Sequence, residues 1–413
     1  MSNVLIIGGG IAGLSSAYYL HKKGHQITIL DKGEITDNCS FGNAGMIVPS
    51  HFVPLASPGM IQQGIRWMFN SKSPFYVRPS FNPSLIGWGL KFLKHANSGH
   101  VSRSAVPLRD LSMFSKQLFE DLCKEPGFEF ELKSKGILAF YKTEKAAEEE
   151  AHLAKSAIEL ELDMAVLNPE ECRLLQPDLK LDVLGAVHYR NDAHVYPPML
   201  MNALLNYLDR EGVAIMRNHE VTKVESQGIK ITKVFTGNKV WEADEYVLAA
   251  GSWSPAIAKM MDLNISIMPG KGYSFMEKEP LDRMSIPALL CEARVAITPM
   301  NGSIRYSGTM ELDKINSRVN MQRVRGIVES VPKYFPDLKP ELPAEKEIWY
   351  GFRPSSPDGL PYIGRSTTRV NLIVATGHGM MGLSLGPATG ALVSQIISAE
   401  QPEIDIRSFS PAR

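Results

Sequence analysis

The stretch Val4–Gly13 has the sequence VLIIGGGIAG, and it decides the fold. Its apolar segment, Val4–Ile7, runs directly into a G-x-G-x-x-G turn made by Gly8, Gly10 and Gly13. In such a turn the first glycine permits a tight bend, the second lets a pyrophosphate approach bare backbone, and the third lets a helix lie close to the strand. The free N–H groups at the start of that helix favour phosphate. The stretch therefore predicts a dinucleotide-binding unit.

A helix, a second strand and an acidic residue complete the unit. Residues 12–23 carry apolar side chains at helical spacing, and Gly24 follows where a helix commonly ends in a left-handed residue. Gln26–Leu30 is expected to be a parallel strand, because the connections are short and a helix crosses between the strands. Asp31 ends this strand, where a carboxylate can accept hydrogen bonds from ribose hydroxyls.

A glycine-rich region near the other end of the chain favours FAD over NAD. Gly351–Gly359 has the sequence GFRPSSPDG, and Leu372–Gly379 has the sequence LIVATGHG. This pattern is that of a strand and loop closing over an isoalloxazine ring. The first glycine turn begins at residue 8, and a second G-x-G-x-x-G turn is missing, so a separate NAD(P)H domain is not expected.

Arg353 is the first candidate for substrate binding. A planar, permanently charged guanidinium is a natural clamp for a carboxylate, although an ordinary salt bridge is the alternative. His378, between two glycines, is a candidate catalytic base or simply part of a tight loop. Asp358 has the pattern of a turn residue whose neighbours could touch the cofactor.

Three further segments have open interpretations. The small-residue loop Cys39–Gly45 suits the phosphate and ribityl oxygens of a flavin, or is a plain surface loop. Tyr273 and Tyr306 could line a substrate pocket, but most tyrosines are packing residues. His51 and His194 have weaker claims to a role.

The composition limits the function classes. The chain of 413 residues has 44 Lys plus Arg and 44 Asp plus Glu, so a formal net charge of zero argues against nucleic acid as the main partner. Its four cysteines are scattered without metal-ligand spacing, so neither a disulfide framework nor a metal site is expected. No run approaches the ~20 apolar residues of a membrane-spanning helix. No basic leader precedes the first strand, and a cytoplasmic protein is expected.

One segment leaves membrane contact open. Leu85–Leu93 is expected to be an amphipathic packing helix. Peripheral contact with the inner face of the cell membrane is the alternative, supported by the nearby Arg66, Trp67 and Met68.

The rest of the chain predicts a second, α+β region. The long stretch 41–83 is loop-like and is expected to be functional rather than disordered, because it holds many aromatic residues. Short strands are expected between about 266 and 310. Helices are expected over residues 106–123, 144–163, 197–212, 317–330 and 388–398, and strands over residues 136–141, 214–216, 221–224 and 246–251.

Five motifs in order resemble those of the D-amino acid oxidase/glycine oxidase superfamily, and most closely those of bacterial FAD-dependent D-amino acid dehydrogenases. The resemblance covers nearly the whole chain. Its carriers are Cys39–Gly45, His51–Gly59, Ala249–Ser254, Gly351–Pro361 and Thr376–Gly379.

The resemblance implies an α/β fold, with a Rossmann-like FAD-binding domain and an α+β substrate domain that has a mixed or antiparallel sheet. The FAD-binding domain is expected to comprise residues 1–50, 100–125, 168–262 and 346–413, and the substrate domain residues 51–99, 126–167 and 263–345. In relatives, the arginine that matches Arg353 grips the substrate carboxylate, and Tyr273 and Tyr306 are the further catalytic candidates. The residues that motif and resemblance together assign to FAD are Gly8, Gly10, Ile11, Ala12, Gly13, Asp31, Lys32, Ser40, Asn43, Ala44, Gly45, Met46, Val221, Ala250, Gly251, Trp253, Gly377, His378, Gly379, Met380, Met381, Gly382 and Leu383.

The chain departs from relatives that attach flavin covalently. The cysteine used by sarcosine oxidases is absent from Arg353–Pro357, and the histidine of dimethylglycine-type enzymes is absent from the Ser40 loop. Non-covalent FAD is therefore expected.

The function that the resemblance implies is oxidation of a D-amino acid, such as D-proline or D-hydroxyproline, by hydride transfer from Cα to flavin N5, with a quinone-like electron acceptor. A glycine or sarcosine oxidase that makes hydrogen peroxide is one alternative. A tRNA wobble-base modifying flavoprotein is another, which the neutral charge disfavours, and a non-catalytic flavin sensor is a third.

Overall fold

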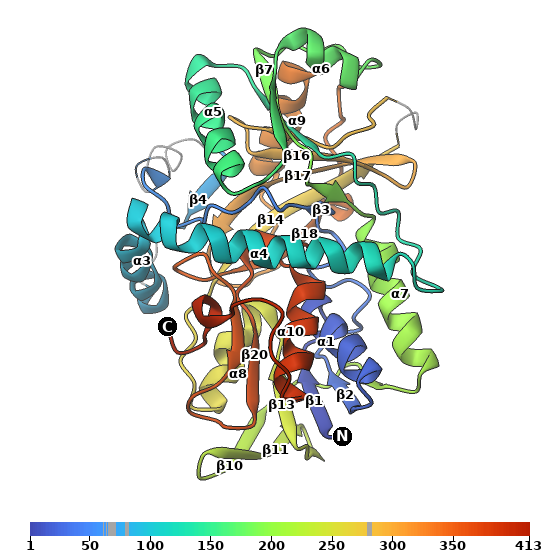
Figure 1. The fold of residues 1–413 in the computed structure, drawn as a ribbon, viewed down its shortest axis with the longest axis vertical. Helices are drawn as coiled ribbons and strands as arrows, with labels where there is room; N and C mark the ends of the chain where they lie inside the picture. Colours follow the sequence, from blue (N-terminus) through green and yellow to red (C-terminus); the bar gives the residue numbers. More distant parts are fainter. Residues whose placement is uncertain (61, 63, 65–71, 79–81, 279–282) are drawn as a thin grey trace.

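The computed structural model describes residues 1–60, 62, 64, 72–78, 82–278 and 283–413. Within these residues, two large sheets divide the molecule into two halves (Figure 1). The half drawn below contains the N-terminal glycine-rich stretch and the Leu372–Gly379 segment, and the half drawn above contains most of the middle of the chain. The long helix α4 (Ser98–Leu122) crosses between them (Figure 1).

The lower half is built on a mainly parallel sheet with strand order β19-β20-β13-β1-β2-β9. All neighbouring pairs are parallel except β19 with β20. The predicted Gln26–Leu30 strand is confirmed as β2. The elements are β1 (Asn3–Ile7), α1 (Ile11–Lys22), β2 (Gln26–Leu30), α7 (Pro197–Arg210), β9 (Ala214–Met216), β13 (Glu245–Leu248), α8 (Ser254–Met260), β19 (Tyr362–Arg365), β20 (Leu372–Thr376) and α10 (Gly386–Ile397), with a small sheet of β10 (Lys223–Gln227), β11 (Lys230–Thr236) and β12 (Lys239–Trp241).

Glycines let the helices of this half pack closely. A Cβ on Gly13 would lie 1.8 Å from the backbone oxygen of Gly8, so α1 could not sit this close to the strand–helix turn with any other residue. A Cβ on Gly390 would lie 2.4 Å from the backbone carbon of Ser15, where α10 packs on α1. The start of α1 is therefore fixed against the edge of the sheet where the cofactor was expected.

The upper half is a mixed sheet, as predicted. The strand order is β18-β14-β17-β16-β15-β5-β7-β6, and β4 pairs with β17. Antiparallel pairs dominate, and β15 with β5 and β17 with β4 are the parallel ones among the described residues. The elements are β4 (Phe75–Val77), β5 (Ile137–Tyr141), α5 (Glu144–Glu159), β6 (Met164–Leu167), α6 (Pro169–Leu175), β7 (Gly185–Tyr189), β14 (Met268–Glu277), β15 (Ala288–Leu290), β16 (Val295–Met300), β17 (Ser303–Leu312), α9 (Met321–Tyr334) and β18 (Trp349–Ser355).

Some boundaries differ from those expected. Helix α4 begins at Ser98 rather than near residue 106, because the Asn97 side chain accepts a hydrogen bond from the His100 N–H and caps an earlier start. Pro107 is accommodated inside that helix. Two strands of the mixed sheet, β7 and β18, lie in segments that the sequence assigned to the FAD-binding domain. The division into domains stays a prediction, and β18 links the two halves.

The segment that left membrane contact open forms helix α3 (Pro83–His95). Trp88 is its buried anchor, whereas Ile86, Leu90 and Leu93 are exposed by 54%, 63% and 53%. The supporting residues 66–68 lie outside the described part of the chain. No helix among the described residues is long and apolar enough to cross a bilayer.

Candidate functional site

A cavity of about 1690 Å³ is lined by residues of both sheets. The strand–helix turn after β1 and the end of β2 line it from the parallel sheet, and β14, β17 and β18 line it from the mixed sheet. The predicted glycine-rich ends of the chain meet in this space. Its size suits a long cofactor together with a small substrate.

The start of α1 fits a pyrophosphate. Gly10, at the N-cap position, supplies no side-chain hydrogen bond, and the first turn carries no acidic residue. Gly10, Ile11 and Ala12 all line the cavity, and a Cβ on Gly10 would meet nothing closer than the Ser40 Oγ at 3.7 Å. Apart from the Ile11 N–H, which the Ser40 Oγ accepts, the helix presents a partly positive end to the cavity, which is the arrangement that binds phosphate groups.

Asp31 and Ser40 support this turn. The two carboxylate oxygens of Asp31 accept hydrogen bonds from the N–H groups of Gly9, at 2.7 Å, and Gly33, at 2.8 Å. The Ser40 Oγ accepts one from the Ile11 N–H at 3.1 Å. Asp31 lines the cavity and keeps lone pairs for a ribose, because each carboxylate oxygen can accept more than one hydrogen bond.

Further predicted residues lie beside the same end of the cavity. The Lys32 ammonium lies 3.8 Å from the centre of the Trp253 ring, a cation–π contact. Gly8, Lys32, Val221, Ala250, Gly251 and Trp253 all line the cavity.

The Ser40–Met46 loop is held in place by a residue that the sequence analysis missed. The buried Arg305 of β17 donates hydrogen bonds to the backbone oxygens of Asn43, at 2.5 Å, and Phe41, at 3.1 Å. Burial lowers the pKa of its guanidinium to about 10. Asn43, Ala44 and Met46 line the cavity, so Arg305 fixes the wall that they form. The sequence has no local signal for this contact between residues 262 positions apart.

The loop from His378 to Leu383 forms another part of the wall. His378, Gly379, Met380, Met381, Gly382 and Leu383 all line the cavity. His378 is buried, its Nε2 lies 2.9 Å from the Thr389 Oγ1, and burial lowers its pKa to about 4. The ring is therefore neutral at physiological pH and is held by a threonine of α10.

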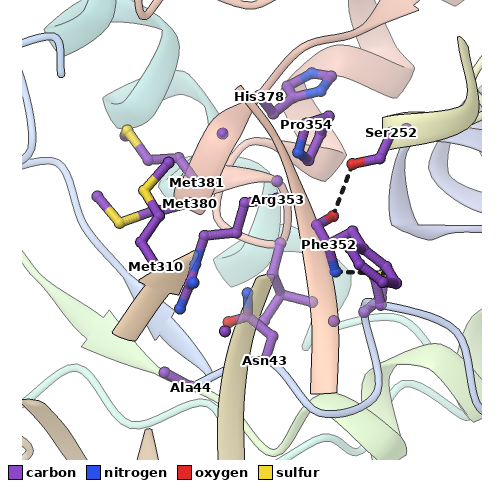
Figure 2. A pocket seen from close by; sticks show the side chains of 18 of the residues that line it. Asn43, Ala44, Ser252, Met310, Phe352, Arg353, Pro354, His378, Met380 and Met381 are labelled. Atoms are coloured by element: carbon purple, nitrogen blue, oxygen red, sulfur yellow. Dashed lines mark hydrogen bonds between the residues drawn. The ribbon is translucent and has the colours of Figure 1, made fainter. Parts of the chain in front are cut away.

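Arg353 projects from β18 toward Met310, and Asn43 and Ala44 lie close to it in the same view (Figure 2). Its Nη1 donates a hydrogen bond to the Thr309 backbone oxygen at 2.6 Å. No carboxylate of the described residues forms an ion pair with it. Burial lowers its pKa to about 10, which still leaves it charged at neutral pH. A partly buried cation without an anion is costly, so the site is suited to an anionic ligand.

Of the two predicted tyrosines, one lines the cavity and the other is buried in the core of the mixed sheet. Tyr273 lines the cavity, but its hydroxyl donates to the Glu311 carboxylate at 3.3 Å and accepts from the Asn320 N–H at 3.1 Å. Tyr306 is fully buried, is stacked on Phe275 with ring centres 5.3 Å apart, and is not among the residues that line the cavity. Its side chain belongs to the core of the mixed sheet, so we do not retain it as a substrate contact.

Three predicted cofactor glycines are also absent from the lining, for packing reasons. Gly13 lies against Gly8, as described above. A Cβ on Gly45 would lie 2.3 Å from the Val195 backbone oxygen, and one on Gly377 would lie 2.8 Å from the Tyr362 ring. Both have positive φ, +76° and +82°, so they shape the cavity loops.

With this geometry in place, comparison with known proteins identifies the family. Residues 3–396 match the family described as DAO, FAD dependent oxidoreductase. The chain belongs to this family. It is an FAD-dependent oxidoreductase, and its α/β fold with a mixed-sheet second half is the one predicted.

Individual relatives of this DAO family member agree with the match. A D-amino acid dehydrogenase of Neisseria meningitidis is 31% identical over 423 residues, which cover 99% of each chain. One of Granulibacter bethesdensis is 30% identical over 417 residues, again 99% of each. Among solved structures, glycine oxidase from Geobacillus kaustophilus has a TM-score of 0.80 at 24% identity, covering 100% of this chain and 98% of the other. That likeness concerns the fold alone.

Proposed function

We propose that the protein oxidises a D-amino acid to its imine and passes the electrons to a quinone-like acceptor. The observation that carries the proposal is Arg353, a partly buried guanidinium on the wall of the cofactor cavity with no carboxylate partner among the described residues. The names of the relatives, D-amino acid dehydrogenase, support the choice of substrate class. D-Proline and D-hydroxyproline are included, because a cyclic amine is oxidised in the same way.

FAD, when bound, supplies the acceptor for the hydride that leaves the substrate Cα. The chain's own part is to hold the substrate. Arg353 binds the carboxylate through the donors that Thr309 leaves free, and this anchors one end of the substrate. The apolar side chains of Met310 and Met381 line the cavity nearby and limit access of water, whereas Met380 lies at its exposed rim (Figure 2). Orientation and desolvation of this kind lower the barrier of a transfer between two bound groups.

We also propose that FAD is held without a covalent bond. Two cysteines of the described residues, Cys39 and Cys291, line the cavity. Burial raises the pKa of both thiols, so they remain protonated and are weak nucleophiles. The Cys39 sulfur also accepts the Phe352 N–H at 3.3 Å.

Peripheral membrane contact through α3 is part of the proposal, because a quinone acceptor resides in a membrane. Its exposed Ile86, Leu90 and Leu93 lie on the same helix as Lys91 and Lys94. An apolar surface flanked by lysines suits an anionic lipid surface.

One experiment tests the activity. The FAD-loaded protein is mixed anaerobically with D- and L-amino acids, glycine, sarcosine and hydroxyprolines, and bleaching of the flavin absorbance is recorded. We expect fastest bleaching by a D-amino acid or a cyclic D-amino acid. Bleaching by L-amino acids or glycine alone would contradict the proposal. Rapid peroxide formation in air, with slow reduction of a quinone analogue, would instead support the oxidase alternative.

A further inference from the structure

Ser50, shortly after β3 (Met46–Ile47), is hydrogen-bonded to Asp192, which is distant in the sequence. β3 forms an antiparallel pair with β8 (Ala193–His194), with Met46 opposite His194 and Ile47 opposite Ala193. This pairing brings Ser50, which follows β3, against Asp192, which precedes β8. One Asp192 oxygen accepts the Ser50 N–H at 3.0 Å, and the other lies 2.5 Å from the Ser50 Oγ. Asp192 is completely buried.

His51 extends this pair toward the cavity. Its Nδ1 lies 3.3 Å from the Ser50 Oγ. When Asp192 is ionised, the single hydroxyl hydrogen of Ser50 is donated to it, so the Nδ1 of His51 carries the hydrogen of this contact. The Nε2 then carries a lone pair. Both Ser50 and His51 line the same cavity as Arg353.

The strand end also lies near the predicted flavin loop. The Val48 N–H donates to the Ser384 Oγ at 3.0 Å, one residue beyond Leu383 of that loop. The His51 N–H donates to the Val48 oxygen at 3.0 Å, so a tight turn folds His51 back toward Val48. His51 is therefore linked through Val48 to Ser384, the residue that follows Leu383.

The charged groups around the three side chains leave the histidine neutral. Burial and, to a smaller extent, the nearby Arg294 lower the pKa of His51 to about 4. Burial raises the pKa of Asp192 to about 7, against the lowering effects of Ser50 and of Lys116 on α4. Glu150 of α5 accepts a hydrogen bond from the Tyr189 hydroxyl at 2.9 Å, and both Glu150 and Arg294 line the cavity.

We propose that His51, Ser50 and Asp192 form a relay that removes the proton from the substrate ammonium group. The inference rests on the proposed function. An amino acid arrives as an ammonium ion, which has no free electron pair to drive loss of hydride from Cα. The Nε2 of His51 takes the ammonium proton, the Nδ1 proton passes to Ser50, and the Ser50 hydroxyl proton passes to Asp192. The products are a neutral amine, a neutral His51 in its other tautomer and a protonated Asp192, so charge and protons balance. Desolvation of the ammonium in the cavity lowers its pKa and assists the transfer.

The test is the pH dependence of flavin reduction, measured by anaerobic stopped flow as kred/Kd for the best amino acid. The main variant is His51→Asn, with His51→Gln as a second, because neither amide can take a proton. Ser50→Ala and Asp192→Asn interrupt the relay behind the histidine. His152→Asn is the matched control, since His152 is an exposed histidine of the same cavity outside the relay.

We expect the wild-type profile to rise through pH 7 and level off. At pH 7, His51→Asn should be slower by about 10²-fold, the usual contribution of a proton-transfer group. Its profile should shift to the pKa of the free substrate amine, and above that pH its rate should return to within a few-fold of wild type. Recovery at high pH separates a lost proton acceptor from a damaged pocket. Equal loss at every pH, or an unshifted profile, would overturn the relay.

Two further readouts do not depend on turnover. Benzoate, a carboxylate without an amine, should perturb the flavin spectrum with the same Kd in wild type and His51→Asn. Histidine ¹⁵N NMR should find His51 as the neutral Nδ1–H tautomer, and Ser50→Ala should remove that preference. A Nε2–H tautomer in wild type would overturn the relay. If no amino acid bleaches the wild-type flavin, the proposed function itself fails and the relay falls with it.

Discussion

Gly272 on β14 is where a single methyl group would displace Arg353 without touching any charge. A Cβ at position 272 would lie 2.1 Å from the Arg353 Nη1 and 2.5 Å from its Cζ. Ordinary contact begins at 3.4 Å, so in Gly272→Ala the guanidinium must move by about 1.3 Å, the difference between 3.4 and 2.1 Å. The 2.6 Å hydrogen bond to the Thr309 oxygen would be broken or re-aimed by that shift.

A displacement of about 1 Å in a positioning group costs about 10²-fold, which corresponds to about 2.7 kcal/mol. We therefore expect kred/Kd of Gly272→Ala to fall about 10²-fold for the amino acid substrate, with FAD content unchanged. Anaerobic stopped flow measures the first quantity, and the flavin absorbance per protein measures the second.

The matched control is Gly87→Ala, since a Cβ at this exposed position in α3 would meet nothing within 4 Å. That variant should reduce its flavin at the wild-type rate and be stabilised by up to about 1 kcal/mol. Wild-type kinetics in Gly272→Ala would refute the view that the guanidinium position governs catalysis. Loss of FAD in that variant would also count against it, because position 272 was predicted to act on the substrate alone.

Three other changes test separate parts of the structure. Gly10→Ala should fold normally and lose most of its FAD affinity, because its Cβ meets only the cavity edge. Gly13→Ala should fail to fold, since its Cβ would lie 1.8 Å from a backbone oxygen. Thermal melts and the flavin content of the purified variants distinguish these outcomes. Arg413→Ala removes the ion-pair partner of the buried Asp358. Burial raises the pKa of the Asp358 carboxyl, but the ion pair with Arg413 holds that pKa below its ordinary value. The pair therefore stabilises the fold at neutral pH and loses this effect as the pH falls below 3.8. Urea unfolding of Arg413→Ala should show a free energy of unfolding that is about 3 kcal/mol lower than wild type at pH 7, with a smaller difference in acid. A difference that is independent of pH would contradict this. Leu90→Glu on α3 should weaken sedimentation with phosphatidylglycerol vesicles several-fold while leaving dye reduction unchanged, and equal sedimentation of both proteins would remove α3 as a membrane contact.

The nucleotide half of the fold was predictable because its signals are local. Val4–Gly13 encodes a strand, a turn and a helix start within ten residues, and Asp31 follows one strand later. Each of these elements depends on neighbours in sequence, so spacing alone determines its place. The family match and the parallel sheet agree with that prediction.

The rest of the site depends on contacts between distant segments. Arg305 reaches the Asn43 loop across 262 positions, and Ser50 meets Asp192 across 142. Only the sheet topology brings these residues together, so no local sequence pattern predicts these contacts. Tyr306 shows the converse, because a tyrosine in an alternating strand is equally compatible with a pocket or with the core.

The most direct measurement concerns Arg353 and the substrate carboxylate. Flavin reduction by the best D-amino acid is compared with reduction by the corresponding amine that lacks the carboxylate, in wild type and in Arg353→Met. We expect Arg353→Met to lower kred/Kd for the amino acid by about 10²- to 10³-fold, the usual effect of truncating one partner of a buried charged pair, and to leave the value for the amine unchanged. Equal loss for both compounds, or no loss for either, would contradict the assignment of Arg353 as the carboxylate anchor.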